Sequence, residues 1–222
     1  MIPSGLGFAD VGTDHAYLPL IMLRRGYTGN IFATDVNKGP LEKAKYCIEE
    51  HELTDMVTLR LCDGLDGVEP GLIDTIVIAG MGGDTITGIL DRAEWCFSAR
   101  YRLILQPVTK PEILRYWLIN NGFNIENDDF VTENGTLYQI IVAIFGKSEK
   151  YSDAELFVGK YVHIKDSEHF DALIDTHIRR FESASKGLGK AADTGLSSWH
   201  GIINGILLQL YEMKGKRHGK SL

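Results

Sequence analysis

Residues Ile73–Ala79, with the sequence IDTIVIA, form a nearly continuous apolar run, and the glycine-rich stretch Gly80–Gly83 follows at once. A short apolar run of this kind is typical of a β-strand that is covered on both faces, as the strands of parallel sheets are. The glycines after the run indicate a tight connection at the carboxyl end of the strand. The stretch therefore predicts an inner strand of an α/β sheet.

Outward from this strand, segments with strand character alternate with helical segments over the first 146 residues. Six further strands are predicted from apolar and β-branched runs, at Gly7–Val11, Ile31–Thr34, Val57–Leu61, Leu103–Leu105, Phe123–Val131 and Thr136–Phe145. Helices are predicted between them, at Ala16–Arg25, from Pro40 to about Glu52, and from a capping box of Thr109 and Glu112 to Gly122. Such alternation builds a doubly wound parallel sheet with right-handed crossovers.

The last two predicted strands flank the turn sequence Glu133-Asn134-Gly135, which predicts a β-hairpin. The hairpin adds an antiparallel strand to one edge of the sheet. This arrangement is the pattern of a Rossmann-like class I methyltransferase sheet, whereas a plain dinucleotide-binding domain would continue with a sixth parallel unit. The predicted fold class is therefore α/β, with a terminal antiparallel hairpin.

Beyond the hairpin the pattern changes to two heptad-like stripes with 4-3-4-3 spacing. Their members are Ile174, Ile178, Phe181, Ser185 and Leu188 in the first stripe, and Trp199, Ile203, Ile206, Leu210 and Met213 in the second. A glycine-rich turn region with Gly187, Gly189 and Gly195 separates them, which predicts an antiparallel, coiled-coil-like helical hairpin. We therefore expect two domains, at residues 1–150 and 151–222.

Composition sets the class of protein. The 222 residues include 44% hydrophobic and 24% charged side chains, which excludes a disordered or fibrous chain. No apolar run approaches the roughly 20 residues that span a bilayer, and the first ten residues lack the features of a secretory signal. Three scattered cysteines, Cys47, Cys62 and Cys96, predict neither a disulfide framework nor a zinc site, and Cys47 with His51 makes no metal site. We expect a soluble cytoplasmic protein with no metal.

Charge is distributed unevenly along the chain. Up to Ser152 there are 13 Lys and Arg against 21 Asp and Glu, whereas from Asp153 onward there are 10 against 9. The last nine residues carry four basic side chains and no acid, at Lys214, Lys216, Arg217 and Lys220. A polyanionic partner would be steered to the second half of the chain, although a basic tail can also serve only solubility.

The loop after the first strand, Asp10–His15, is the first candidate ligand site. Sheets of this type bind ligands outside the carboxyl ends of their strands, and Gly12 lets the backbone approach a ligand. Asp10 and Asp14 would repel a pyrophosphate but would favour the sulfonium and ammonium groups of S-adenosylmethionine. The alternative is that both acids are turn residues or helix caps.

Acids at the next two strand ends favour an adenosyl ligand. Asp35 follows the glycine turn by about twenty residues, where an acid accepts hydrogen bonds from ribose hydroxyls. Asp63 can accept from the exocyclic amine of adenine, and Asn37 and Gly64 lie beside these acids in the sequence. An NAD enzyme would share Asp35 but has no need of Asp14. The three strand ends together predict that S-adenosylmethionine lies across the sheet.

The fourth strand end is poor in side chains, because Gly80, Gly82 and Gly83 surround Met81. We expect Gly80, Met81 and Gly82 to contact the cofactor where the methyl group emerges, and Gly83 to leave room for a substrate. The alternative is tight packing. The Asn/Asp-Pro-Pro-Tyr motif of enzymes that methylate exocyclic amines is absent, which argues against an N6-adenine or N4-cytosine target.

Five segments together resemble the bacterial TrmK family, whose members are tRNA (adenine-N1)-methyltransferases acting at position 22. They are ADVGTDHAYLP (Ala9–Pro19), ATDVN (Ala33–Asn37), LCDGL (Leu61–Leu65), IAGMGG (Ile78–Gly83) and LILQP (Leu103–Pro107). The helical tail is similar to the C-terminal coiled-coil module of that family. One departure is Val108, where the family usually has Asn.

The resemblance implies S-adenosylmethionine as cofactor, tRNA as partner and adenine N1 as the methylated atom. N1 carries a lone pair, so no base has to remove a proton, and a carboxylate stabilises the cationic product. Asp14 is the candidate for this role, with His15 and Tyr17 orienting or stacking on the adenine; His15 can instead bond to backbone. Gln106 and Pro107 are candidate substrate contacts, and the candidate RNA contacts are Lys186, Lys190, Lys214, Lys216 and Arg217.

Two alternatives stay open at this point. One is a methyltransferase acting on a small molecule, and the other is a catalytically silent RNA-binding protein on a methyltransferase scaffold. Nothing in the sequence implies a protein partner, and we expect a monomer.

Overall fold

The computed structural model describes residues 2–188 and 194–219. The chain divides into two compact units. The first, which we term the sheet unit, comprises Met1–Asn127 and Tyr138–Glu149. The second, which we term the helical unit, comprises Asp128–Leu137 and Lys150–Leu222, so the outer part of the predicted hairpin groups with the helices.

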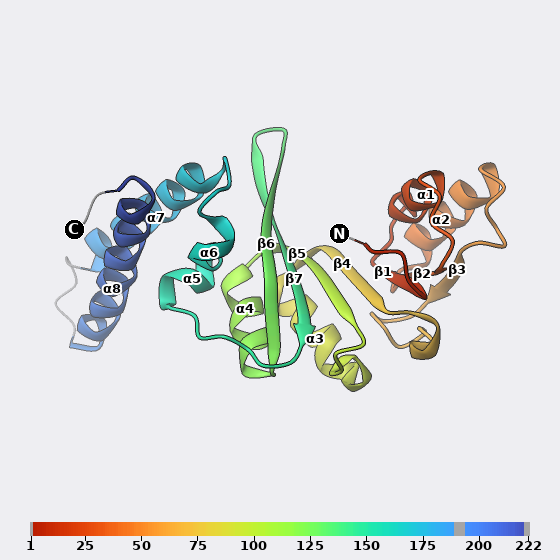
Figure 1. Ribbon diagram of the computed structural model, residues 1–222, viewed down its shortest axis with the longest axis horizontal. Coiled ribbons are helices and arrows are strands. Elements are labelled where there is room, and N and C mark those ends of the chain that lie inside the picture. Colours follow the sequence, from red (N-terminus) through yellow and green to blue (C-terminus); the bar gives the residue numbers. More distant parts are fainter. Residues whose placement is uncertain (1, 189–193, 220–222) are drawn as a thin grey trace. The chain divides into compact units, whose positions relative to one another are not determined.

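A seven-stranded sheet has the order β3-β2-β1-β4-β5-β7-β6 (Figure 1). Its strands are β1 (Gly7–Val11), β2 (Asn30–Asp35), β3 (Thr58–Leu61), β4 (Thr75–Gly82), β5 (Arg102–Thr109), β6 (Phe123–Glu133) and β7 (Thr136–Phe145). The pairs from β3 to β5 are parallel, and β7 is antiparallel to β5. The predicted fold class, with all seven strands, is confirmed.

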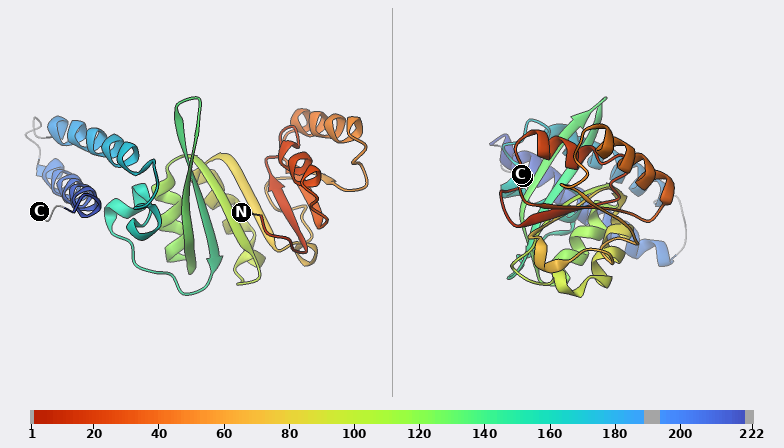
Figure 2. Two further views of the ribbon diagram at one scale, coloured as in Figure 1. Left: turned by 45° about the horizontal axis from the view of Figure 1, so that its top comes forward. Right: turned by 90° about the vertical axis from the view of Figure 1, so that its right-hand side faces the viewer.

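Helices cover both faces of the sheet (Figure 2). They do so because successive side chains of the apolar inner strands point to opposite faces, so both faces are apolar. Phe8, Ile31, Val77 and Ile104 pack with α1 (Tyr17–Arg24) and α2 (Lys38–Glu50) in one buried cluster. On the other face, α3 (Gly83–Arg92) contacts β4, β5 and α4 (Pro111–Asn120). Two short 3-10 helices, Pro70–Leu72 and Glu94–Cys96, complete this unit.

The predicted capping box at Thr109 and Glu112 is wrong. Thr109 still belongs to β5, and the residue before α4 is Lys110, which has a φ of 55° and no side-chain cap. A capping box is found instead at the start of α5 (Asp153–Val158). There the Ser152 hydroxyl accepts from the Glu155 N–H at 3.3 Å, and the Glu155 carboxylate accepts from the Ser152 N–H at 2.9 Å.

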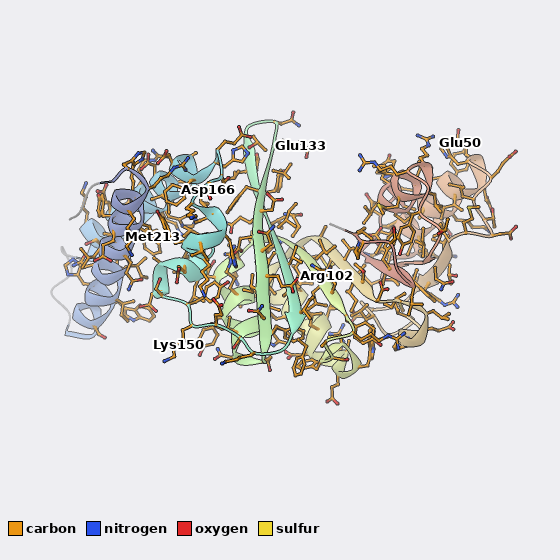
Figure 3. All side chains as sticks on the ribbon, in the orientation of Figure 1. Glu50, Arg102, Glu133, Lys150, Asp166 and Met213 are labelled. Atoms are coloured by element: carbon orange, nitrogen blue, oxygen red, sulfur yellow. The ribbon has the colours of Figure 1, made fainter. Side chains whose placement is uncertain are left out.

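The turn between β6 and β7 has the geometry that its sequence predicts. Asn134 has a φ of 49° and Gly135 a φ of 78°, so both central residues are left-handed. This is the condition for a type I′ turn, which suits the twist of a hairpin. Figure 3 marks Glu133, the last residue of β6, at the tip.

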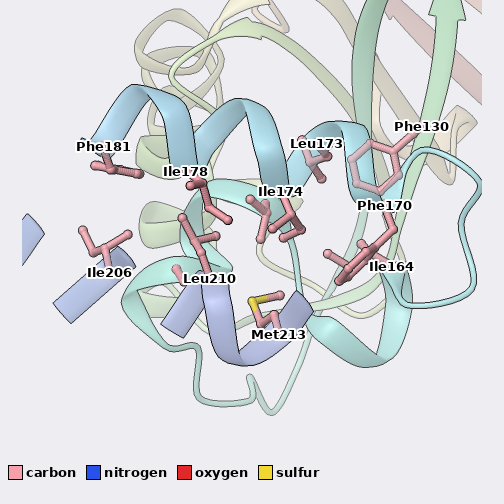
Figure 4. Packing of buried hydrophobic residues seen from close by; sticks show 12 residues of the cluster. Phe130, Ile164, Phe170, Leu173, Ile174, Ile178, Phe181, Ile206, Leu210 and Met213 are labelled. Carbon is pink, nitrogen blue, oxygen red and sulfur yellow. The ribbon is translucent and has the colours of Figure 1, made fainter. Parts of the chain in front are cut away.

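Two long helices, α7 (Phe170–Leu188) and α8 (Thr194–Arg217), form the predicted helical hairpin. Their shared apolar core contains the predicted seam residues Ile174, Ile178, Phe181, Ile206, Leu210 and Met213 (Figure 4). Polar contacts give the direction, because Glu182 pairs with Tyr211 and Asp175 with Lys214. As residue numbers rise on one helix they fall on the other, so the helices are antiparallel. The short α6 (Tyr161–Ile164) also belongs to the helical unit.

Glycines do not make the turn that we predicted at Gly187 and Gly195. Gly187 is the last residue but one of α7 and Gly195 is the second residue of α8, so each helix extends through its glycine, whose cost in a helix is only about 1 kcal/mol. Gly189, the third predicted turn residue, lies outside the described residues, and so does the side chain of Leu188.

The seam becomes polar where α7 ends and α8 begins. The Ser185 hydroxyl donates to Oδ1 of Asn204 at 2.9 Å and lies 3.0 Å from Nε2 of His200. Trp199, predicted on the seam, is exposed instead. The bonded side chains of Ser185, His200 and Asn204 thus replace apolar packing at this level.

In the part of the chain that the structure describes, no helix is both long and apolar enough to cross a membrane. The same described residues include no group of three or more His, Cys, Asp or Glu side chains placed to hold a metal ion.

Candidate active site

The β1–α1 loop is fixed against the neighbouring strand β2. The N–H groups of Gly12 and Thr13 both donate to the carbonyl of Thr34, at 2.8 and 3.0 Å. Gly12 has a φ of 75°, and a Cβ there would lie 2.3 Å from Cε of Met81. The positive φ favours glycine at this position, whereas the end of the flexible Met81 side chain could shift to make room for a Cβ.

A cleft of about 250 Å³ opens at the carboxyl ends of β1, β2 and β4, and we term it the strand-end cleft. It gathers seven of the ten predicted cofactor residues, namely Gly12, Asp35, Asn37, Asp63, Gly64, Gly80 and Met81. Asp10, Asp14 and Gly82 are not among the residues that line it in the described part of the chain. Thr34, Thr85 and Ile89 also line it, and no sequence motif indicated a role for them.

Asp10 is buried and serves the loop. Its Oδ2 accepts from the Thr13 hydroxyl at 2.6 Å. Burial raises the pKa of Asp10 to about 6, although the hydrogen bond from Thr13 acts in the opposite direction. The structure places Asp10 within β1, where its carboxylate holds Thr13 at the base of the loop that carries Gly12.

The two acids of the strand-end cleft differ in how they are held. Asp35 is buried, and its Oδ1 accepts from the Asn37 N–H at 2.8 Å, which fixes the carboxylate. Asp63 is exposed, and its Oδ1 lies 2.7 Å from the Arg92 guanidinium of α3. Arg92 had no predicted role. Its partner Asp63 keeps a second oxygen that can accept from an exocyclic amine.

Two different constraints explain why glycines occur at the end of β4. A Cβ at Gly83 would lie 2.3 Å from the Lys110 carbonyl oxygen, so tight packing explains this position. Gly80 has a φ of 75°, and a Cβ there would meet no atom within 4 Å. Its surroundings are open because it lines the strand-end cleft. Asp84, next to Gly83, forms an ion pair with Lys110, which ties the two strand ends together.

Gln106 holds the Gly80 backbone. Its Oε1 accepts from the Gly80 N–H at 2.8 Å, while its Nε2 is buried and has no hydrogen-bond partner within the described ranges. In the β4–β5 register Gln106 lies opposite Ala79 and Pro107 lies opposite Met81, with irregular pairing beyond Ala79. The two predicted substrate residues of the LILQP segment thus border the glycine stretch.

Asp14, His15 and Tyr17 form a small cluster at the start of α1. The rings of His15 and Tyr17 stack with centroids 5.1 Å apart and 8° between their planes. Nε2 of His15 lies 3.7 Å from Oδ2 of Asp14, whose side chain is exposed. The residue before α1 is Ala16, with a φ of 56° and no side-chain cap, so Asp14 does not cap the helix.

The predicted RNA contacts fall into two groups. Lys186 and Lys216 are exposed and form none of the ion pairs found among the described residues. Lys214 pairs with Asp175, and Arg217 donates to the Ser167 carbonyl at 3.0 Å and lies 4.0 Å from Asp171. Lys190 and Lys220 lie outside the described residues.

A doubly wound sheet with a reversed edge strand, and an open cleft with acids at its strand ends, defines a class I methyltransferase. The family model described as TrmK, tRNA (adenine(22)-N(1))-methyltransferase, matches residues 8–196. A Bacillus subtilis (strain 168) protein of the same description is 30% identical over 198 residues, which are 87% of this chain and 83% of that protein. The chain therefore belongs to the TrmK family of tRNA (adenine(22)-N(1))-methyltransferases, as its sequence motifs predicted.

Solved structures support the same family. The B. subtilis m1A22 tRNA methyltransferase TrmK has a TM-score of 0.85 and 28% identity, with 96% of this chain and 93% of that chain covered. M. capricolum TrmK, solved with the cofactor product S-adenosyl-homocysteine, has a TM-score of 0.80 and 25% identity, with 93% and 92% covered. Both matches extend over sheet and helices. Family membership favours the tRNA methyltransferase over the two alternatives.

Proposed function

We propose that this chain methylates N1 of the adenine at position 22 of tRNA, and that S-adenosylmethionine binds in its strand-end cleft. The observation that carries the proposal is the cleft itself, where Gly12, Asp35, Asp63 and Gly80 converge from four strand ends. Such an edge of an α/β sheet is where adenosyl ligands bind. The M. capricolum relative was solved with S-adenosyl-homocysteine, which supports this choice of cofactor.

The acids of the cleft suit an adenosyl ligand. The buried Asp35 is already oriented by the Asn37 N–H, so it can accept from ribose hydroxyls with little further ordering. Asp63 accepts from the adenine amine through the oxygen that Arg92 leaves available. Gly80 and Met81 line the end of the cleft nearest β5, where Gln106 fixes the Gly80 backbone.

S-adenosylmethionine supplies an electrophilic methyl group when it is bound. The adenine N1 lone pair forms the new N–C bond, and the electron pair of the broken C–S bond stays on sulfur. No proton leaves N1, so the chain has to position the base and stabilise the developing cation. Asp14 is the proposed carboxylate, since it is exposed beside the stacked rings of His15 and Tyr17.

The helical unit is proposed as the RNA-contacting module. The sequence predicted this module at residues 151–222, and the helical unit also includes Asp128–Leu137. Lys186 and Lys216 present exposed cations on α7 and α8. Cations of this kind bind phosphates by releasing counterions. We also propose that the chain acts as a monomer in the cytoplasm, where tRNA is used.

The test incubates the chain with methyl-labelled S-adenosylmethionine and either tRNA or a metabolite extract, followed by nucleoside analysis of the digested tRNA. The proposal predicts N1-methyladenosine at position 22. Label in a small molecule would support the metabolite alternative, and no label with tRNA bound would support the silent RNA-binding protein. N6-methyladenosine formed directly would refute the target atom.

A further inference from the structure

The sheet unit has a second hollow besides the strand-end cleft. A groove of about 740 Å³ lies between α1 and α2, and we term it the α1–α2 groove. Its lining comes from the start of α1 and from one face of α2, and includes His15, Tyr17, Lys43, Tyr46 and Glu50. No step of the proposed reaction uses Lys43, Tyr46 or Glu50.

Two residues of the proposed active site also line the α1–α2 groove. His15 and Tyr17 line the groove, and Gly12, three residues before His15, lines the strand-end cleft. The residues on either side of His15 hold left-handed backbone, with φ of 49° at Asp14 and 56° at Ala16. The loop thus turns twice and presents His15 to the groove rather than to the cleft.

Two aromatic side chains of the groove face solvent. Tyr46 is 68% exposed and Tyr17 is 60% exposed, whereas the ring of a tyrosine is usually largely buried. His15 stacks on the Tyr17 ring. The Tyr46 ring stacks on no other ring of the described residues, so the exposed part of the ring can take a planar ligand. Unpaired nucleobases stack on such rings without regard to sequence.

The charged side chains of the groove limit the chemical class of ligand that can bind there. Glu42 and Glu50 line the groove against the single cation Lys43, and both acids are exposed. Lys38 lies 3.6 Å from Glu42 and offsets it, whereas Glu50 forms none of the ion pairs found among the described residues. With Lys38 beside Glu42 and Lys43 in the same lining as Glu50, the groove offers no net positive charge to a phosphate, whereas a neutral base with exocyclic amines can stack on Tyr46 and donate to a carboxylate. Figure 3 marks Glu50 near the end of α2.

We propose that the α1–α2 groove binds an unpaired nucleobase of the tRNA substrate, namely one that flanks the target adenine, by stacking on Tyr46. The inference rests on the proposed function. A target adenine turned out of its stack leaves its neighbours without a stacking partner, at an energetic cost. A base bound in the groove regains that stacking and holds the strand beside the active site.

The first test compares tRNA binding by the wild-type chain, Tyr46→Ala and Tyr46→Phe, in the presence of S-adenosyl-homocysteine. Tyr46→Ala is expected to weaken tRNA binding on the order of tenfold. Tyr46→Phe is expected to bind tRNA as the wild-type chain does, because phenylalanine keeps the stacking face. Tyr116→Ala is the matched control, since Tyr116 is 61% exposed on α4 of the same unit. The affinity for S-adenosylmethionine should stay unchanged in all variants, which shows that the fold is intact.

The second test changes the RNA. Target tRNAs with an abasic nucleotide on the 5′ or the 3′ side of the adenine are bound to the wild-type chain and to Tyr46→Ala. One of the two abasic tRNAs should bind the wild-type chain about tenfold more weakly, with no added loss in Tyr46→Ala. Additive losses, or wild-type binding by Tyr46→Ala, would overturn the groove proposal while leaving tRNA methylation standing. A wild-type chain that neither binds nor methylates tRNA would refute the proposed function itself.

Discussion

The strand-end cleft is shaped mainly by backbone groups. The helical hairpin of α7 and α8 is held together mainly by side chains. The cleft depends on glycines with positive φ at Gly12 and Gly80 and on N–H groups that fix the loops. The hairpin depends on a repeated apolar seam, with ion pairs such as Lys214–Asp175 beside it. The contrast teaches that single substitutions in the hairpin should change stability, whereas substitutions at the cleft should change ligand binding or rate.

The largest effect is expected for Leu210→Ala, which removes a fully buried side chain from the hairpin core. We expect it to lower the free energy of unfolding by about 2–5 kcal/mol, measured by chemical denaturation, because a cavity is left behind. Leu208→Ala is the control, since Leu208 is exposed on the same helix. The affinity for S-adenosylmethionine should not change; a large fall in it would break the comparison.

The next effect is kinetic. Asp14→Asn should lower the single-turnover rate of tRNA methylation by about 10²-fold or more, the scale of losing one transition-state electrostatic contact. Cofactor affinity should stay close to wild type, because Asp14 does not line the strand-end cleft. Asp55→Asn, at an exposed acid between α2 and β3, serves as the control. A rate near that of the wild type would remove Asp14 from the proposed mechanism.

Asp10 is expected to make the folding stability depend on pH. Its folded-state pKa of about 6 lies above the ordinary value of 3.8, so the folded chain binds a proton more tightly than the unfolded chain does. Stability from this group is therefore present at low pH and is lost as pH rises from about 4 to about 6. The loss amounts to roughly 2–3 kcal/mol. Asp10→Asn should remove this part of the pH dependence in denaturation curves; an unchanged pH profile would contradict it.

The smallest effect is expected for single lysines of the hairpin. Lys216→Ala should weaken tRNA binding a few-fold and reduce the slope of log affinity against log salt by about 0.7–0.9, as for one lost phosphate contact. Lys214→Ala should change the slope less, because Lys214 is paired with Asp175. Lys147→Ala, at an exposed lysine of the sheet unit, is the control. Equal slopes for all variants would count against the helical unit as the RNA-contacting module.

Periodicity predicted the strands and the helical hairpin, because both are set by burial along one segment at a time. The IDTIVIA run became β4, and the Ile174 stripe became the α7 side of the seam. Helix α3 was missed because it begins within the glycine stretch at Gly83. The capping box at Thr109 failed because β5 extends through that residue, which local sequence does not reveal.

Residues that line the strand-end cleft were predictable where they lie at strand ends, as Gly12, Asp35 and Asp63 do. Contacts between distant segments were not. Arg92 meets Asp63 only after α3 packs on the sheet, and no local motif indicates it. Tyr46 joins Tyr17 in the α1–α2 groove across 29 positions of sequence. Such side chains acquire their setting from tertiary packing alone.

In the proposed function, S-adenosylmethionine binds in the strand-end cleft and Asp35 accepts hydrogen bonds from its ribose. Calorimetric titration of S-adenosylmethionine into the wild-type chain and into Asp35→Ala tests this claim most directly. We predict tight binding by the wild-type chain and a loss of about 1.5–3 kcal/mol in the variant, as for hydrogen bonds to a charged group. Unchanged affinity in Asp35→Ala, or tight binding of NAD in place of S-adenosylmethionine, would contradict it.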